Sequence, residues 1–335
     1  MDTKCLIYSI IMPTFNSERT LDEALNAIRS QNFNQDEIEI LVVDGGSTDN
    51  TRKIAEKYNC IIIDNPERLP EPAKKYGMMY AKGKYVCIMG SDEILTEKNQ
   101  LLERYQILEK HPDIHCLICS LYAPKDYAPL CAYINAVGDP FTCFVYQTYS
   151  NKISNLRKNL YKKDGHAYIF KFAPDDITPI GDGGTVLDLE FIRKNYEKEA
   201  DELESSLLFD IVLRDTKYLI ILDNDWVKHL SKADFKTYLN KVKFRVVNNI
   251  HDVEKSGFAN RAQIKQKLNR RKYLYPIYCL TIIWPLMDSI KMCINFKNKV
   301  FMCHFIFTYY VMIQVIYEYA KKIFGKKSTI TEYGK

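Results

Sequence analysis

The first 95 residues alternate short apolar runs with amphipathic segments, and this alternation limits the possible folds more than any other feature of the chain. Runs rich in β-forming residues occupy 6–12, 38–43, 60–63 and 84–89. The segments between them have helical spacing: one begins at Ser17, and the others span 51–58 and 72–81. Strands that alternate with helices in this way predict a parallel sheet with right-handed crossovers. We therefore expect an α/β fold, and 335 residues are enough to bury its core without disulfides or structural metals.

Polar or small residues follow three of these strands at the point where each strand ends. They form the segments Pro13-Thr14-Phe15-Asn16, Asp44-Gly45-Gly46-Ser47 and Gly90-Ser91-Asp92-Glu93. In open parallel sheets, ligands bind where the carboxyl ends of the strands open into loops. The sequence therefore predicts one binding site at this edge of the sheet, built from three loops that are far apart in the chain.

The residue types in these loops suit a nucleotide diphosphate and a divalent metal. Asp44 can accept hydrogen bonds from a base or a ribose, and the glycines after it allow close approach of the backbone. The helix that follows offers its N-terminus to a negative group. Asp92 and Glu93 supply hard oxygen ligands suited to Mg²⁺ or Mn²⁺. Plainer interpretations also exist, with Asp44-Gly45-Gly46 as a turn and Ser91-Asp92 as a helix cap.

Composition and charge exclude several classes of protein. Apolar residues make up 47% and charged residues 27%, which is ordinary for a globular chain. The formal charge of +5 is too small to indicate a nucleic-acid binder. The cysteines lie mainly in apolar runs, including Cys116 and Cys119 in an expected buried strand, so they predict free thiols in a reducing cytosol. The apolar run before Pro13 is interpreted as a strand and not as a signal peptide.

The last hundred residues are basic and contain two aromatic-rich apolar segments, at 273–290 and 300–317. Each is about as long as the shortest segment that can span a bilayer. Pro276 and Pro285 interrupt the first, and the lysines between the two segments oppose the positive-inside tendency of a spanning hairpin. We therefore favour helices that lie in the membrane interface and let their lysines reach the headgroups, on the cytoplasmic face of a membrane. A buried helical hairpin of a soluble domain is the alternative.

Four segments together resemble the inverting family-2 glycosyltransferases of GT-A fold: 9–16 (SIIMPTFN), 40–49 (ILVVDGGSTD), 73–77 (AKKYG) and 81–86 (AKGKYV). The resemblance implies a Rossmann-like mixed sheet flanked by helices, followed here by a C-terminal helical tail. It implies that Thr14, Phe15 and Asp44 hold the nucleotide of a sugar donor, and that Asp92 is the remaining metal ligand of an Asp-x-Asp motif. The other residues expected on the donor side are Pro13, Asn16, Lys74 and Ser91.

Among several departures from the family pattern, two concern the expected metal ligands and the expected base. Gly90 stands where the first Asp of Asp-x-Asp is usual, so the motif reads Gly-Ser-Asp-Glu, and Glu93 is a candidate replacement ligand. Phe209 stands where the Glu of the family's Glu-Asp motif is usual, but Asp210 remains.

In the second half of the chain the resemblance implies the remaining roles. Asp210 is the expected catalytic base, with Asp201, Glu202 and Glu204 as alternatives nearby. Alternatively, Asp210 has no catalytic role and only forms an ion pair with Arg214, four residues later on the same helix. His229 is placed near the diphosphate or the metal, or is a structural histidine. The turn Gly183-Gly184-Thr185 is placed beneath the acceptor, or is simply a turn before a helix near 189–196.

We therefore expect a GT-A domain over 1–250, with a donor half over 1–95 and an acceptor half over 96–250, and a membrane-associated helical region over 251–335. Its expected function is inverting transfer of a sugar, hexosyltransferase-like, from a nucleotide-sugar donor to a polyprenyl-linked or cell-surface glycan, with Mg²⁺ or Mn²⁺. A membrane-bound pseudoenzyme that binds a nucleotide sugar is the main alternative. A nucleotidyltransferase is disfavoured because Pro13-Thr14-Phe15-Asn16 lacks a triphosphate loop. The oligomeric state is not predicted.

Overall fold

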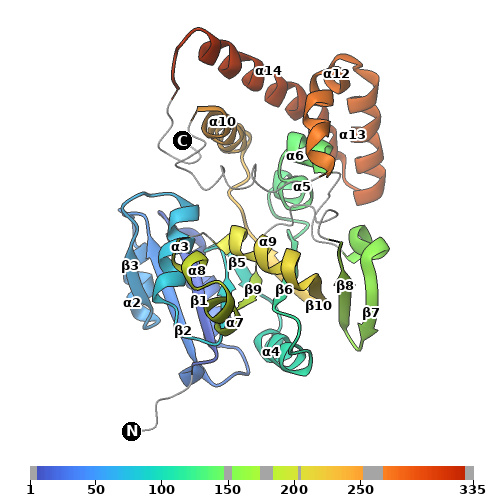
Figure 1. Cartoon of the computed structure of the whole chain (residues 1–335). Coiled ribbons are helices and arrows are strands. Elements are labelled where there is room, and N and C mark those ends of the chain that lie inside the picture. Colours follow the sequence, from blue (N-terminus) through green and yellow to red (C-terminus); the bar gives the residue numbers. More distant parts are fainter. Residues whose placement is uncertain (1–5, 147–152, 174–183, 203–204, 252–266, 329–335) are drawn as a thin grey trace. The chain divides into compact units, whose positions relative to one another are not determined.

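The computed structural model describes residues 6–146, 153–173, 184–202, 205–251 and 267–328 (Figure 1). The chain divides into two compact units. Unit 1 comprises Met1–Tyr122, Asn151–Ile177 and Gly181–Leu230, and unit 2 comprises Ala123–Ser150, Thr178–Ile180 and Ser231–Lys335. This division differs from the expected boundary at 250, because Ala123–Ser150 and the chain from Ser231 onward belong to unit 2.

Unit 1 contains the strands, which are β1 (Tyr8–Thr14), β2 (Ile38–Asp44), β3 (Ile61–Asp64), β4 (Tyr85–Ile88), β5 (Glu93–Leu95), β6 (Cys116–Tyr122), β7 (Leu160–Asp164), β8 (Ala167–Lys171), β9 (Thr185–Asp188) and β10 (Tyr218–His229). Its helices are α1 (Glu18–Arg29), α2 (Thr51–Lys57), α3 (Pro70–Tyr80), α4 (Gln100–Lys110), α7 (Leu189–Asn195), α8 (Glu197–Glu202) and α9 (Ser205–Thr216), with short 3-10 turns at Gln35–Glu37 and Ile153–Asn159.

The strands form one mixed sheet in the order β3-β2-β1-β4-β9-β6-β10-β8-β7, with β5 paired to β10; β3 and β7 are its two edges (Figure 1). The predicted parallel order is confirmed, because β1 pairs in parallel with β2 and β4, and β2 with β3. β9 is antiparallel to both β4 and β6, which makes the sheet mixed. Because Thr185 pairs with Ile88, the start of β9 lies at the edge where the donor-half strands end.

The sequence explains the local structure of the donor half. Every residue of β2 is buried, as expected for a parallel strand covered on both faces. In α1 the buried residues Leu21, Ala24, Leu25 and Ile28 recur with helical spacing and face the core. Gly77 lets α3 approach β1 closely, because a Cβ at this position would lie 2.3 Å from Cγ2 of Ile11.

Unit 2 is helical in the residues that the structure describes. Its helices are α5 (Pro129–Val137), α6 (Pro140–Tyr146), α10 (Phe235–His251), α12 (Tyr275–Leu280), α13 (Ile283–Phe296) and α14 (Cys303–Ile323), with 3-10 turns at Lys267–Leu274 and Lys299–Met302. Tyr133 of α5, Tyr238 of α10 and Phe307 of α14 meet in its core. The two apolar segments of the sequence are therefore packed, along one face, on residues more than a hundred positions earlier.

Candidate active site

The first two loops at the strand ends are joined by hydrogen bonds. The side-chain oxygen of Asn16 accepts from the backbone N–H of Thr48 at 2.8 Å, and the N–H of Asn16 donates to Oγ of Ser47 at 2.8 Å. Asn16 has a φ of 48°, a left-handed conformation that asparagine tolerates better than most residues. The loops after β1 and β2 thus form one polar surface, on which Phe15 is 38% exposed.

Asp44 lies beneath this surface with its side chain fully buried. Its carboxylate accepts hydrogen bonds from Oγ1 of Thr14 at 3.0 Å and from the N–H of Ser47 at 3.0 Å, and it pairs with Arg52 at 3.3 Å. Asp44 therefore organises the loop, and the prediction that it holds the nucleotide requires one of these partners to be exchanged for the ligand. Gly46 completes the turn with a φ of 83°.

Two arginines that the sequence interpretation missed lie at this loop. Arg52, on α2, also pairs with Asp64 at 2.7 Å, and these hydrogen bonds, the one to Asp64 first, raise the pKa of its guanidinium. Arg68 is exposed and lies over the glycine turn, since a Cβ on Gly45 would be 3.4 Å from the Arg68 Cα. The positive φ of Arg68, 57°, turns the chain back over the loop. No sequence motif indicates either contact, because each depends on how β3 and the segment after it return to the loop.

The third loop brings Asp92 and His229 together. Nε2 of His229 lies 3.6 Å from Oδ2 of Asp92, and both side chains are partly exposed. His229 is the last residue of β10 and precedes Leu230, whose N–H donates to the carbonyl of Asp92 at 2.8 Å. Oγ of Ser91 donates to Oγ of Ser17 at 2.9 Å, which links this loop to the first one. The helix-cap interpretation of Ser91-Asp92 is wrong, because strand β5 follows it.

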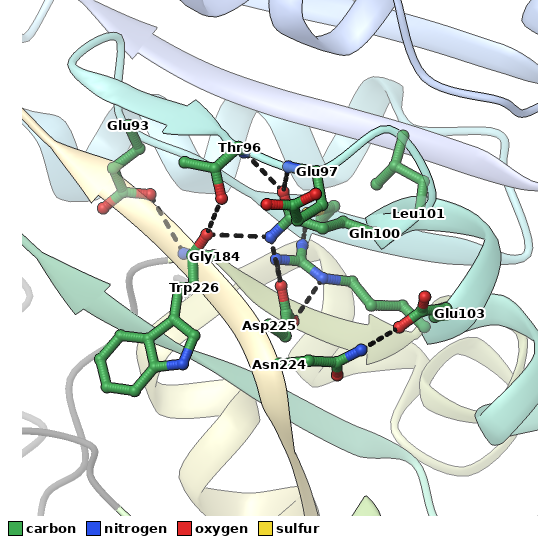
Figure 2. A network of polar contacts seen from close by, with 12 residues as sticks. Glu93, Thr96, Glu97, Gln100, Leu101, Glu103, Gly184, Asn224, Asp225 and Trp226 are labelled. Carbon is green, nitrogen blue, oxygen red and sulfur yellow. Dashed lines mark hydrogen bonds and ion pairs between the residues drawn. The ribbon is translucent and has the colours of Figure 1, made fainter. Parts of the chain in front are cut away.

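The side chain of Glu93 is buried and lies beside Gly90, as does that of Asp92. The residue is 6% exposed, and its Oε2 accepts from the N–H of Gly90 at 3.1 Å and from the N–H of Gly184 at 3.1 Å. Figure 2 shows the second of these bonds. Asp92 occupies the space beside Gly90, since a Cβ at Gly90 would lie 2.8 Å from Oδ1 of Asp92. Asp92 therefore takes up space that a side chain at residue 90, the position of the missing first Asp of the motif, would need.

A buried polar network holds β10 beneath the site (Figure 2). Arg104, on α4, is fully buried and makes two 2.7 Å hydrogen bonds to the carboxylate of Asp225. Gln100 donates to Asp225 at 2.7 Å and to the carbonyl of Trp226 at 3.0 Å. The register of β10 against β6 shifts between Ile221 and Trp226, so the network fixes an irregular stretch of strand just before His229.

Asp210 lies in α9 and forms an ion pair with Arg214, as the sequence analysis allowed for a residue with a purely structural role. Nε of Arg214 donates to its carboxylate at 2.7 Å, and the Asp210 side chain is 12% exposed. α9 ends at Thr216, just before β10 begins at the opposite end of that strand from His229. Phe209, in place of the family Glu, is buried.

The turn expected on the acceptor side is described from Gly184 onward. Gly184 has a φ of 60°, and Thr185 begins β9 with a buried hydroxyl that has no hydrogen-bond partner within the described ranges. Gly183 lies outside the described residues.

The other predicted residues lie on helices. Lys74 is half-buried in α3. Two of the alternative bases, Asp201 and Glu202, belong to α8, and the third, Glu204, lies outside the described residues.

The candidate metal ligands at Asp92 fit a divalent metal that is held partly by a diphosphate. Among the residues that the structure describes, no group of three or more His, Cys, Asp or Glu side chains surrounds one point. Asp92 supplies a carboxylate, a ligand type that suits Mg²⁺ and Mn²⁺, and the imidazole of His229 lies 3.6 Å from it. Mg²⁺ and Mn²⁺ commonly take one or two protein ligands and complete their shell with substrate phosphates and water.

Comparison with known proteins agrees with this architecture. Residues 9–173 match the model of "Glycosyl transferase family 2". Over 113 residues the chain is 32% identical to the poly(ribitol-phosphate) β-N-acetylglucosaminyltransferase TarS of Staphylococcus aureus, covering 32% of this chain and 20% of TarS. It is 26% identical over 243 residues to a dolichyl N-acetyl-α-D-glucosaminyl phosphate 3-β-D-2,3-diacetamido-2,3-dideoxy-β-D-glucuronosyltransferase of Methanococcus voltae, covering 69% of this chain and 64% of that protein. The chain thus spans less than two thirds of either curated relative.

Solved structures show the same fold at low sequence identity. The mannosyltransferase PcManGT of Pyrobaculum calidifontis, in complex with GDP-Man and Mn²⁺, superposes with a TM-score of 0.57 at 14% identity over 97% of this chain and 89% of that one. TarS 1–349 in complex with UDP-GlcNAc superposes with a TM-score of 0.51 at 16% identity over 96% and 93% of the two chains. Residues 9–173 are therefore similar to glycosyl transferase family 2, and the chain has the GT-A fold of these solved glycosyltransferases.

Proposed function

We propose that unit 1 transfers a sugar from a nucleotide-sugar donor to an acceptor hydroxyl, with inversion at the anomeric carbon. The observation that carries this proposal is the meeting of Asp92 and His229, 3.6 Å apart, at the edge of the sheet where the loops after β1 and β2 are joined. Similarity to family 2 supports the reaction class, and the polar loop surface supports a nucleotide as the donor's leaving group.

On the donor side, the exposed Phe15 ring and the linked loops offer a surface for a base and ribose, with Pro13, Thr14 and Asn16 shaping it. Arg68 adds a positive charge over the turn. Asp92 and His229 would hold Mg²⁺ or Mn²⁺ against the diphosphate. When bound, such an ion neutralises charge on the leaving diphosphate.

Asp210 is the proposed base. In the reaction, the acceptor oxygen forms a bond to the anomeric carbon, the bond from that carbon to the diphosphate breaks, and the hydroxyl proton passes to the carboxylate. The Arg214 pair fixes the orientation of the Asp210 carboxylate, and the 12% exposure of the side chain leaves it accessible to a bound acceptor.

A second candidate function is a nucleotide-sugar-binding protein without turnover. Gly90 and Phe209 favour it, because each replaces a carboxylate of the family pattern. This candidate predicts donor binding with no release of nucleoside diphosphate, so measurement of both separates the two functions.

The acceptor is proposed to be a lipid-linked or cell-surface glycan. The names of the curated relatives describe a poly(ribitol-phosphate) acceptor for TarS and a dolichyl phosphate-linked sugar for the Methanococcus protein. The backbone of Gly184 and the start of β9 lie at the same edge of the sheet as the donor loops, which supports an acceptor-side role for this segment.

Unit 2 is proposed to bind the surface of an anionic membrane. Five large apolar residues along α13 are between 45% and 69% exposed: Ile283, Trp284, Met287, Ile290 and Ile294. Contiguous apolar surface of this kind is rare on soluble monomers. Three exposed lysines lie on or beside the same helices and suit anionic headgroups: Lys272, Lys291 and Lys297.

One helix of unit 2, Lys299–Ile323, is long and apolar enough to cross a membrane. However, one face of α14 is already covered by protein: Phe307 and Val311 lie in the core, and Glu318 is buried against His251. The segments Arg270–Leu280 and Ile283–Phe296 meet at 98°. These features favour helices that lie in the interface over a spanning hairpin.

A donor screen tests the proposed reaction. UDP-GlcNAc, GDP-mannose and other nucleotide sugars are added with Mn²⁺ or with EDTA, and the thermal unfolding of the full chain is followed. A true donor present at 100 times its dissociation constant stabilises the native state by about 2.7 kcal/mol, and EDTA removes that stabilisation. Release of nucleoside diphosphate from the same donor then distinguishes the enzyme from the binding protein.

A further inference from the structure

The buried carboxylate of Glu93 joins two segments that lie 94 positions apart in the chain, at Gly90 and Gly184. One oxygen, Oε2, accepts both backbone N–H groups at 3.1 Å. Figure 2 shows the bond from Gly184. The first N–H belongs to the loop that carries Asp92, and the second lies in the turn that opens β9. A hydrogen bond to an ionised acceptor is roughly twice as strong as one between neutral groups.

Both ends of this link are held in place by their surroundings. Gly184 has a φ of 60°, and a Cβ there would lie 2.3 Å from the Cys119 sulfur, so this position accepts only glycine. The N–H of Glu93 donates to the carbonyl of Gly90 at 3.0 Å, which closes the loop tightly. Glu93 is also the strand partner of His229 where β5 pairs with β10. Its carboxylate therefore joins the loop to the turn, and its backbone pairs with the end of β10.

We infer that Glu93 is a positioning residue that locks the Asp92 loop to the Gly184 turn, and that it is not a ligand of the metal. This inference rests on the proposed function for the roles of Asp92 and Gly184. Its chemical basis is independent of that function, because the residue is 6% exposed and its Oε2 already accepts two backbone N–H groups, whereas Asp92 and His229 are partly exposed. Donor-side and acceptor-side segments would then keep a fixed spacing through one carboxylate.

The test compares Glu93→Ala, Glu93→Gln and Asp92→Asn, with Glu97→Ala as a control that removes an exposed carboxylate from the next loop. Amide hydrogen exchange at Gly90 and Gly184 is measured by NMR or mass spectrometry on the full chain. In Glu93→Ala both amides should exchange at least about tenfold faster, because both lose a hydrogen bond to a charged group. Glu93→Gln keeps an acceptor oxygen and should retain most of the protection, and the Asp92 and Glu97 variants should retain all of it.

Metal-dependent binding gives the second measurement, with UDP and GDP as probes and Mn²⁺ as the ion. Glu93→Gln should retain Mn²⁺-dependent binding, whereas Asp92→Asn should lose it. Equal loss in both variants would make Glu93 a metal ligand and overturn the inference. Unchanged exchange at both amides in Glu93→Ala would overturn it as well.

A further variant covers the case in which Glu93→Ala does not fold. Glu93→Asp retracts the carboxylate by one methylene and should raise exchange at the same two amides, and unchanged protection there would again contradict the inference. If the wild-type chain binds neither nucleotide with Mn²⁺, the proposed function fails, but the exchange measurements still decide whether Glu93 links the two segments.

Discussion

The two units differ in how many large apolar side chains they expose, although both bury charged groups, as at Glu318 in unit 2. Unit 1 buries charge: the guanidinium of Arg104 and the carboxylates of Asp44 and Asp225 lie inside it, each with hydrogen-bond partners. Unit 2 exposes apolar groups: Ile283, at 65%, and Leu280, at 74%, are among many that face solvent. The difference is consistent with the proposed roles of the two units, a polar site in unit 1 and a membrane-binding surface on unit 2.

The largest expected effect is on the chemistry assigned to unit 1. Asp210→Asn keeps the shape of the side chain but removes the proton acceptor, so turnover should fall by about 10²–10⁴-fold with donor affinity and membrane binding unchanged. Steady-state kinetics and donor titration measure these quantities. Asp215→Asn, on the same helix, is the control and should be nearly silent.

Two results would change the role given to Asp210. If Asp210→Asn lost donor affinity and kept turnover, Asp210 would be only the partner of Arg214. If Asp210→Asn were silent and Asp201→Asn or Glu204→Gln were inactive, the proposed reaction would stand, but the catalytic base would be Asp201 or Glu204.

The next effect concerns the buried charge of unit 1. Asp225→Ala leaves Arg104 without its partner inside the protein and should lower the free energy of unfolding by about 3–5 kcal/mol. The matched control is Asp22→Ala, which breaks the exposed pair with Lys57 and should produce no measurable change. Urea denaturation of each full-length variant gives the comparison. Similar, small effects in both variants would show that the network of Figure 2 contributes little to stability.

A smaller effect is expected at the surface of unit 2. Removal of residues 270–335 is not a clean test, since Tyr275 and Phe307 belong to the core of that unit. Trp284→Asp instead alters a residue that is 58% exposed. Binding of this variant to vesicles containing phosphatidylserine should weaken by at least about tenfold, because burial of one large apolar side chain contributes about 1.5–3 kcal/mol.

Leu160→Asp, at an exposed apolar residue of unit 1, is the control for vesicle binding and should leave it unchanged. High salt should release an interfacial protein in part, and complete resistance to salt and carbonate would instead favour a spanning helix. Equal vesicle binding by Trp284→Asp and Leu160→Asp would contradict the assignment of membrane binding to unit 2.

The smallest effect is expected at Gly90. In Gly90→Ala the new Cβ meets Oδ1 of Asp92 at 2.8 Å, and the carboxylate can rotate away at low cost. The affinity for Mn²⁺, titrated in the presence of nucleotide, should weaken only a few-fold, with an unchanged unfolding temperature. Tighter Mn²⁺ binding in Gly90→Ala would contradict the position assigned to Asp92.

The donor half could be predicted from sequence because its information is local. Each buried strand is an apolar run that ends at polar residues, and the loops at 13–16, 44–47 and 90–93 lie where parallel order requires them. The pairs that complete the site are not local. Arg104 and Asp225 are 121 positions apart, and Glu93 and Gly184 are 91 apart.

No periodicity or spacing connects such residues, because their contact depends on how β9 and β10 enter the sheet. The same reason explains why the sequence did not predict that 123–146 pack with the C-terminal helices. It also explains why Glu93 was a candidate metal ligand by residue type, although its burial gives it another set of partners.

The central claim is that unit 1 holds a nucleotide-sugar donor through a divalent metal at Asp92. The most direct measurement is calorimetric titration of the full chain with the donor found in the screen, with and without Mn²⁺, for the wild type and for Asp92→Asn. We predict that the wild type binds only with Mn²⁺, and that Asp92→Asn loses this binding while its unfolding temperature is unchanged. Undiminished Mn²⁺-dependent binding by Asp92→Asn would contradict the assignment of the metal and, with it, the donor site described here.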